Sequence, residues 1–235
     1  MSLKALVLIL SITVIVSLNL GLAEKPVHQK DLYFPSLSLK YLTLGYNDTM
    51  ADLYWLRLIQ DIENCGKKNE KDGSSANPGG RHMGRNRVPA CSMGWGYHML
   101  DLITDLTPRF HAPASMGPLT LSVVTDDIDG ATLIFEKSMK NFPEDWVIFY
   151  QAGYHFQFEL ENEKRAADLY QIATRAPQSP LWLPLLVARL HTNMGEIEIA
   201  KHILLRYRKK VLDNPALLKR TDDKLSALKK KRAKE

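Results

Sequence analysis

The sequence predicts an all-α protein of stacked helix-turn-helix units, preceded by an N-terminal hydrophobic helix. Three observations support this prediction. After Leu39, apolar residues recur at spacings of three and four over long stretches, as in amphipathic helices. Small and aromatic residues repeat at a spacing of about 34 residues, the length of a helical hairpin repeat. An uncharged apolar run, residues 5–20, comes before both patterns.

Residues 1–23 are predicted to be a targeting segment. Lys4 provides a short positive region before the apolar run, and Gly21 and Ala23 are the small residues that a cut after Ala23 requires. The alternative is an uncut transmembrane anchor over residues 3–22, since the run rises about 24 Å as a helix against a hydrocarbon core of ~30 Å. Both alternatives leave Lys4 inside and carry the rest of the chain across a membrane.

Residues 24–38 are predicted to be an extended linker, because Pro26 and Pro35 interrupt a stretch with few periodic apolar residues. A first helical hairpin is predicted over residues 39–107. A loop over residues 65–94 interrupts this hairpin, and its many glycines and polar residues have little to bury.

Cys65 and Cys91, the two cysteines of the chain, bracket this loop. An exported protein meets an oxidising compartment, where an even number of cysteines favours a disulfide. Closing a loop of about 25 residues would stabilise the fold by roughly 3 kcal/mol in the chain-entropy model. The alternative is a metal site of both cysteines with His82 and His98, but these spacings lack the paired ligands of compact zinc sites. We therefore expect a disulfide and no metal.

TPR-like repeats are predicted over residues 108–212. Two units share a small residue where helices cross and an aromatic residue one turn later: Ala131 with Phe135, and Ala166 with Tyr170. Gly153 provides a second small residue, in the first helix of the second unit. In the first unit, Asp129 lies in the acidic turn between the helices and is a candidate cap for the second helix. A poorer third unit spans residues 181–212.

The C-terminal segment, residues 213–235, is predicted to be a basic capping helix and tail. Pro215 ends the third unit, and the charged helix is expected from Lys219 onward. The chain carries a net charge of +5, and the excess of basic over acidic residues lies between Lys209 and the C-terminus. The charge distribution therefore gives no indication of a nucleic-acid-binding domain. Solubility of an exposed end explains the tail, and contact with anionic lipid is the alternative.

With these residues the chain resembles the tetratricopeptide repeat family, although Ser115 and Leu119 replace its usual tryptophan and glycine. The resemblance implies a right-handed superhelix in which the first helices line a concave groove that binds a peptide of a partner protein. By position, the groove would present Met116, Thr120, Tyr150, Tyr154, Gln157, Arg189 and Asn193.

Two features of this predicted groove have a physical rationale. Tyr150 and Tyr154 lie one helical turn apart and would form an amphipathic platform. Arg189 would pair with a carboxylate of the partner. The alternative is that the two tyrosines only pack between repeats.

Motifs of catalysis are not found in the sequence. It has no G-x-S-x-G turn and no phosphate-binding G-x-x-x-x-G-K-[ST] loop. The histidines are scattered, and only a cluster of perturbed groups around His98 and His111 would indicate a hydrolase-like envelope enzyme. We expect no catalytic residue and no cofactor.

The function expected from these patterns is a non-enzymatic scaffold that binds other proteins at the bacterial cell envelope, on the periplasmic side of the inner membrane. It would be anchored through residues 3–22, or soluble after cleavage at Ala23. The alternative is a structural subunit of a larger membrane complex, whose N-terminal helix packs against other membrane helices.

The intact mass of the natively expressed protein tests the disulfide. Because both thiols would be consumed in the bond, we predict no alkylation of Cys65 or Cys91 before reduction and two alkyl groups afterwards. Two alkyl groups without reduction would contradict the bond. The same spectrum reports whether the first 23 residues have been removed.

Overall fold

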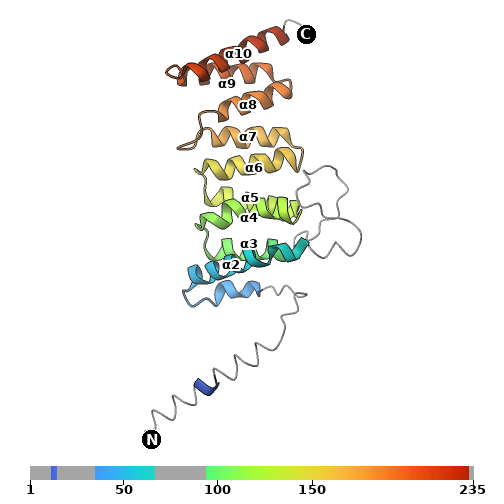
Figure 1. Cartoon of the computed structure of the whole chain (residues 1–235), viewed down its shortest axis with the longest axis vertical. Helices are drawn as coiled ribbons and strands as arrows, with labels where there is room; N and C mark the ends of the chain where they lie inside the picture. Colours follow the sequence, from blue (N-terminus) through green and yellow to red (C-terminus); the bar gives the residue numbers. More distant parts are fainter. Residues whose placement is uncertain (1–11, 15–34, 67–93, 233–235) are drawn as a thin grey trace, which may run out of the picture. The chain divides into compact units, whose positions relative to one another are not determined.

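The computed structural model describes residues 12–14, 35–66 and 94–232, and all regular secondary structure in these ranges is helical. The chain divides into two compact units, Met1–Tyr33 and Phe34–Glu235. Of the first unit, only residues 12–14 are described, and they are helical and exposed. The predicted all-α class is therefore confirmed for the described residues (Figure 1).

Two sequence predictions fall largely outside these ranges. None of the described helices combines the length and hydropathy that crossing a membrane requires, and the apolar run at residues 5–20 is described only at residues 12–14. Cys91 lies outside the described residues, and the side chain of Cys65 is not among those described. The anchor or signal peptide and the disulfide therefore remain predictions.

The first described helix of the second unit is a 3₁₀ helix, η1 (Leu37–Tyr41), and the other helices described in this unit are α-helices. The described α-helices of this unit are α2 (Asn47–Gly66), α3 (Trp95–Leu106), α4 (His111–Val124), α5 (Ile128–Asn141), α6 (Trp146–Phe158), α7 (Glu163–Ala173), α8 (Leu183–Asn193), α9 (Ile197–Lys210) and α10 (Pro215–Arg232).

The helices of this unit pack mainly as consecutive pairs: α2 with α3, α4 with α5, α6 with α7, and α8 with α9. The turns inside the last three pairs are only a few residues long, so the two helices of each pair run antiparallel. Successive pairs also contact one another, and α10 packs on α9. Figure 1 shows the helices stacked in chain order.

The residues predicted at helix crossings lie in the core. Ala131, Phe135, Ala166 and Tyr170 are all almost completely buried, which confirms their expected packing role. Gly153 explains how α6 approaches α7 so closely, because a Cβ atom at this position would lie 2.7 Å from Cε1 of Tyr170. No side chain larger than a hydrogen fits this crossing without displacing the tyrosine ring.

The cap of α5 is Asp127, so the prediction of Asp129 was wrong. The Asp127 carboxylate accepts a hydrogen bond from the Gly130 backbone N–H at 2.9 Å. Asp126 adopts a left-handed φ of 57°, which turns the chain and places Asp127 rather than Asp129 ahead of the first helical turn. A Cβ atom on Gly130 would clash with the Asp127 carboxylate at 2.4 Å, so this cap also requires a glycine.

The last helix starts at Pro215, not at Lys219. Proline is well suited to the first turn of a helix, where its missing N–H has no partner to lose, and the Asn214 side chain accepts from the Leu217 N–H at 3.1 Å. Leu217, Leu225 and Leu228 pack on a core cluster shared with α8 and α9. The predicted start of this helix was too late because Pro215 was interpreted only as the end of the preceding unit.

We predict that Gly153→Ala destabilises the protein by about 1–2 kcal/mol, because overpacking against Tyr170 outweighs the higher helix propensity of alanine. Urea unfolding measures the change. The matched test is the same substitution in a Tyr170→Leu background, where the clash is removed and the cost should fall to near zero. An equal cost in both backgrounds would contradict the assigned contact.

Candidate functional site

The structure places the predicted groove residues on three helices. Met116 and Thr120 lie on α4, Tyr150, Tyr154 and Gln157 on α6, and Arg189 and Asn193 on α8. Met116 is 58% exposed and Tyr154 39% exposed. Arg189 and Asn193 are exposed, and the remaining three are half-buried.

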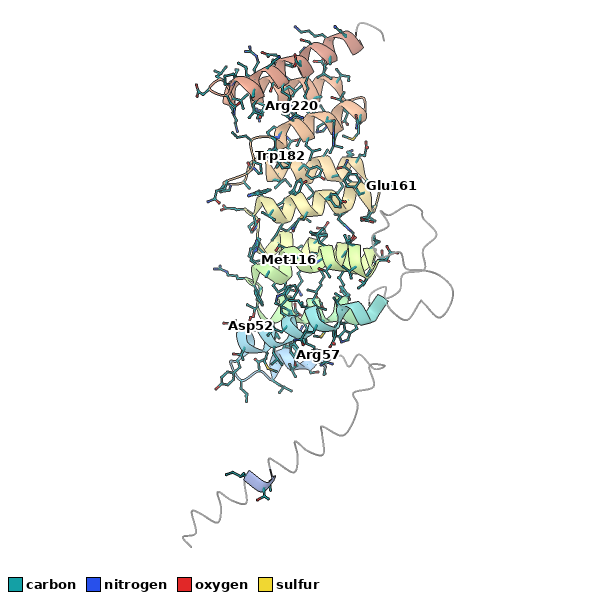
Figure 2. The ribbon with its side chains drawn as sticks, viewed as in Figure 1. Asp52, Arg57, Met116, Glu161, Trp182 and Arg220 are labelled. Atoms are coloured by element: carbon teal, nitrogen blue, oxygen red, sulfur yellow. The ribbon has the colours of Figure 1, made fainter. Side chains whose placement is uncertain are left out.

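Tyr150 is the centre of an aromatic cluster. Its ring lies 5.5 Å from that of Tyr170, 5.6 Å from that of Trp182 and 6.3 Å from that of Trp146, between centroids. The ring of Tyr150 therefore packs against Tyr170 of α7 and against Trp182, the residue before α8, while Tyr154 and Trp182 stay accessible. Figure 2 labels Trp182, which is the residue before α8.

The phenol of Tyr170 joins the core to this cluster. Its hydroxyl donates to Oε1 of Gln157 at 3.1 Å. Burial raises the pKa of Tyr170, the phenols of Tyr150 and Tyr154 raise it further, and the positive charge of Arg189 opposes them. Four of the seven predicted residues thus surround one buried, neutral phenol.

Beyond Arg189 the surface is cationic. Burial and the positive charges of Arg220 and Arg189 lower the pKa of Lys224, so these three cations are close enough to repel one another. Arg189 and Lys224 line a hollow of about 140 Å³ between α8 and α10. Within the described residues, none of the three forms an ion pair with a carboxylate. Like charges held together without a counter-ion are suited to bind an anion.

We call this surface the even-helix face; it consists of Tyr150, Tyr154, Gln157, Trp182, Arg189, Arg220 and Lys224. Trp182, Arg220 and Lys224 were missed by the groove prediction. Arg220 and Lys224 are four residues apart and therefore share one side of a helix. This spacing could have indicated them, but the basic charge of the C-terminal segment was attributed to solubility. Figure 2 shows Arg220 on α10.

Three predicted groove residues are not joined to this face by the described contacts. Met116 and Thr120 contact each other on α4, where the Thr120 hydroxyl donates to the Met116 carbonyl oxygen at 2.9 Å. Asn193 lies exposed at the end of α8. Their assignment to a partner groove remains a prediction.

A buried histidine, His155, ties three helices together. Thr132 Oγ1 donates to the Ile128 carbonyl oxygen at 2.8 Å, so it accepts from Nε2 of His155, also at 2.8 Å. Nδ1 then accepts from the Ser122 hydroxyl at 3.1 Å. Both ring nitrogens are satisfied in the neutral form, and burial lowers the pKa of His155 to about 4. With no exposed surface, this histidine is a structural link between α4, α5 and α6.

The contacts given for the described residues do not join the two histidines considered for catalysis. His111 Nε2 lies 2.6 Å from Oδ2 of Asp145, the residue that caps α6 by accepting from the Val147 N–H at 2.8 Å. His98 lies on α3 and its ring contacts Tyr97. Among the described residues there is no group of three metal-ligating side chains, and His82 lies outside them.

Comparison with known proteins gives no further guide to the site, because neither the models of known families nor the curated proteins include a match to this chain.

We predict that His155 lowers the stability of the folded protein as the pH decreases. The folded-state pKa of about 4 lies below the ordinary value of 6.5, so the unfolded chain binds more protons between these values. The contribution of His155 to the free energy of unfolding is highest above pH 6.5, where the imidazole is neutral in both states. It decreases by roughly 3 kcal/mol as the pH falls to 4, because the unfolded chain then binds the proton more tightly.

Urea unfolding at pH 7.5, 6, 5 and 4.5 measures this loss, and the same series on His155→Gln removes the contribution of the imidazole from it. A pH dependence that is identical in the two proteins would contradict the burial of a neutral histidine.

Proposed function

We propose that this protein is a non-enzymatic helical-repeat scaffold that binds partner proteins through its even-helix face. In this proposal the stack is a TPR-like right-handed superhelix. Consecutive antiparallel pairs and the small-to-aromatic contact between Gly153 and Tyr170 support it. The predicted residues Met116, Thr120 and Asn193 would extend the contact surface.

The observation that carries the proposal is the change from aromatic to cationic character along one surface. Tyr154 and Trp182 are accessible, and the ring of Trp182 contacts that of Tyr150. Arg189 acts on the buried phenol of Tyr170 and lines one hollow together with Lys224. Accessible aromatic rings and arginine are the side chains that most often dominate protein–protein binding. The best-fitting partner segment has an apolar or aromatic side chain followed by one or more carboxylates, because the carboxylates would relieve the repulsion between the cations.

The proposed location is the periplasmic side of the bacterial inner membrane. Lys4 followed by the apolar run at residues 5–20 supports export. The protein would then be anchored through residues 3–22, or released by a cut after Ala23. A Cys65–Cys91 disulfide fits such a compartment.

One observation favours the alternative, a structural subunit of a larger membrane complex. Leu53, Leu56 and Ile59 are each more than half exposed on α2, and their spacing of three places them along one side of that helix. An apolar stripe of this kind is typical of a contact surface. It lies on the helix that follows the linker to the predicted anchor.

Photocrosslinking in cells tests the proposal at matched positions. A benzophenone amino acid replaces Tyr154, which is 39% exposed on α6, or Ile172, which is 38% exposed on α7. We expect discrete crosslinked proteins from position 154 and none of them from position 172. Arg189→Glu and Lys224→Glu should each reduce these products at least about tenfold, because they reverse the charge facing the carboxylates.

Products that are equal at positions 154 and 172, or unaffected by both charge reversals, would exclude the even-helix face as the binding surface. A third probe at Leu56 separates the two functions. Products from Leu56 alone would favour the structural subunit of a membrane complex.

A further inference from the structure

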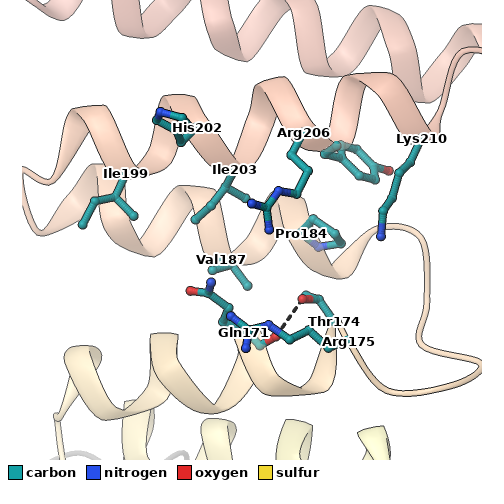
Figure 3. Close-up of a pocket in the computed structure, with 11 residues that line it drawn as sticks. Gln171, Thr174, Arg175, Pro184, Val187, Ile199, His202, Ile203, Arg206 and Lys210 are labelled. Atoms are coloured by element: carbon teal, nitrogen blue, oxygen red, sulfur yellow. Dashed lines mark hydrogen bonds between the residues drawn. The ribbon is translucent and has the colours of Figure 1, made fainter.

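A second hollow lies between α7 and α9, and none of the residues of the even-helix face line it. This α7–α9 cavity has a volume of about 380 Å³, within the range of small-molecule sites, roughly 300–1,000 Å³. Gln171 comes from α7 and Arg175 from the turn that follows it, Pro184 and Val187 come from α8, and Arg206 and Lys210 come from α9. Figure 3 shows the side chains of Arg206 and Lys210 extending from α9 toward α7.

One part of the cavity is apolar. Val187 is buried, Ile203 half-buried and Ile199 46% exposed, and Pro184 completes this part of the lining. Ile199 and Ile203 are four residues apart, so they form a continuous strip along one side of α9. An apolar chain laid on this strip would remove it from water at a favourable free energy.

The other part is cationic. Arg175, Arg206 and Lys210 line it, and no aspartate or glutamate is among the lining residues. Two other cations of α9 have carboxylate partners: Arg208 Nε lies 2.6 Å from Oδ1 of Asp222, and Lys201 Nζ lies 3.6 Å from Oε2 of Glu198. In the described part of the chain, the three cations of the cavity have no such partner.

We propose that the α7–α9 cavity binds an amphiphilic anion, a carboxylate or phosphate head group on an apolar chain. The head group would be held by Arg175, Arg206 and Lys210, because guanidinium groups bind both oxyanions in a bidentate way. The chain would lie along Ile203 and Ile199. This binding is independent of the partner surface proposed above, since the two sites share no residue.

The arrangement of the cavity sets the class of ligand. A free inorganic anion would leave the strip of Ile199 and Ile203 in water, and an uncharged chain would leave the three cations unpaired. A ligand with a cationic head group would be repelled by them. Only a molecule with an anionic end and an apolar end satisfies both parts of the lining.

Isothermal titration calorimetry of the purified full chain tests the proposal. The probes are decanoate, decyl phosphate and decyltrimethylammonium, all used below their micelle concentrations, and acetate as the head group without a chain. We expect decanoate or decyl phosphate to bind once per chain, with the preferred head group identified by the tighter of the two. Decyltrimethylammonium and acetate should bind at least about tenfold more weakly.

The neighbouring residues Lys210 and Lys209 provide a matched pair of variants, because both are exposed on α9 but only Lys210 lines the cavity. Lys210→Gln and Arg206→Gln should each weaken decanoate binding about tenfold through loss of a charge-assisted hydrogen bond, whereas Lys209→Gln should not change it. Ile199→Ser should weaken binding of decanoate and leave the weak binding of acetate unaltered. Circular dichroism confirms that each variant is folded.

Three outcomes would overturn the proposal. These are equal binding of the decyl cation and the decyl anions, equal weakening by Lys209→Gln and Lys210→Gln, and absence of binding by both decyl anions. None of these outcomes bears on crosslinking from Tyr154, so failure here and failure of the scaffold function are distinguishable.

Discussion

The close approach of α6 to α7 at Gly153 is the contact on which the rest of the described fold depends. Tyr170 fills the space that a side chain at this position would occupy, and its ring reaches through the crossing to Tyr150. The hydroxyl then needs a partner because it is buried, and Gln157 provides one. One missing Cβ atom thus fixes the spacing of two helices and the position of an aromatic cluster at their surface.

Close to this crossing, hydrogen bonds connect α6 to the preceding pair of helices. His155, two residues from Gly153, is bound to Ser122 and Thr132 on the preceding pair of helices. Gly153 therefore joins α6 to α7 within its own pair by close packing, and His155 joins α6 to the preceding pair by hydrogen bonds. A single helix connects its two neighbours, which is how a linear array of repeats gains its stability.

The cations of the second unit differ in whether they have a carboxylate partner. Many cations of the described helices have a carboxylate within reach, as in the pair of Arg208 and Asp222. Among the described cations that form no such pair, two groups gather: Arg189, Arg220 and Lys224 on the even-helix face, and Arg175, Arg206 and Lys210 at the α7–α9 cavity. Each group borders an apolar or aromatic surface, and this combination, rather than the net charge of the chain, makes both places candidates for binding.

The sequence by itself determined the helical class and the packing residues, because the small-to-aromatic spacing of Ala131 with Phe135, and of Ala166 with Tyr170, is a local property of a helix. Only the tertiary structure decided which cations gather. Arg189 and Lys224, or Arg175 and Arg206, are far apart in the chain and meet only when consecutive hairpins stack. The cap at Asp127 was missed for a related reason. The left-handed backbone conformation of Asp126 places Asp127 directly before the helix. The sequence of the acidic turn does not show which of its aspartates takes that position.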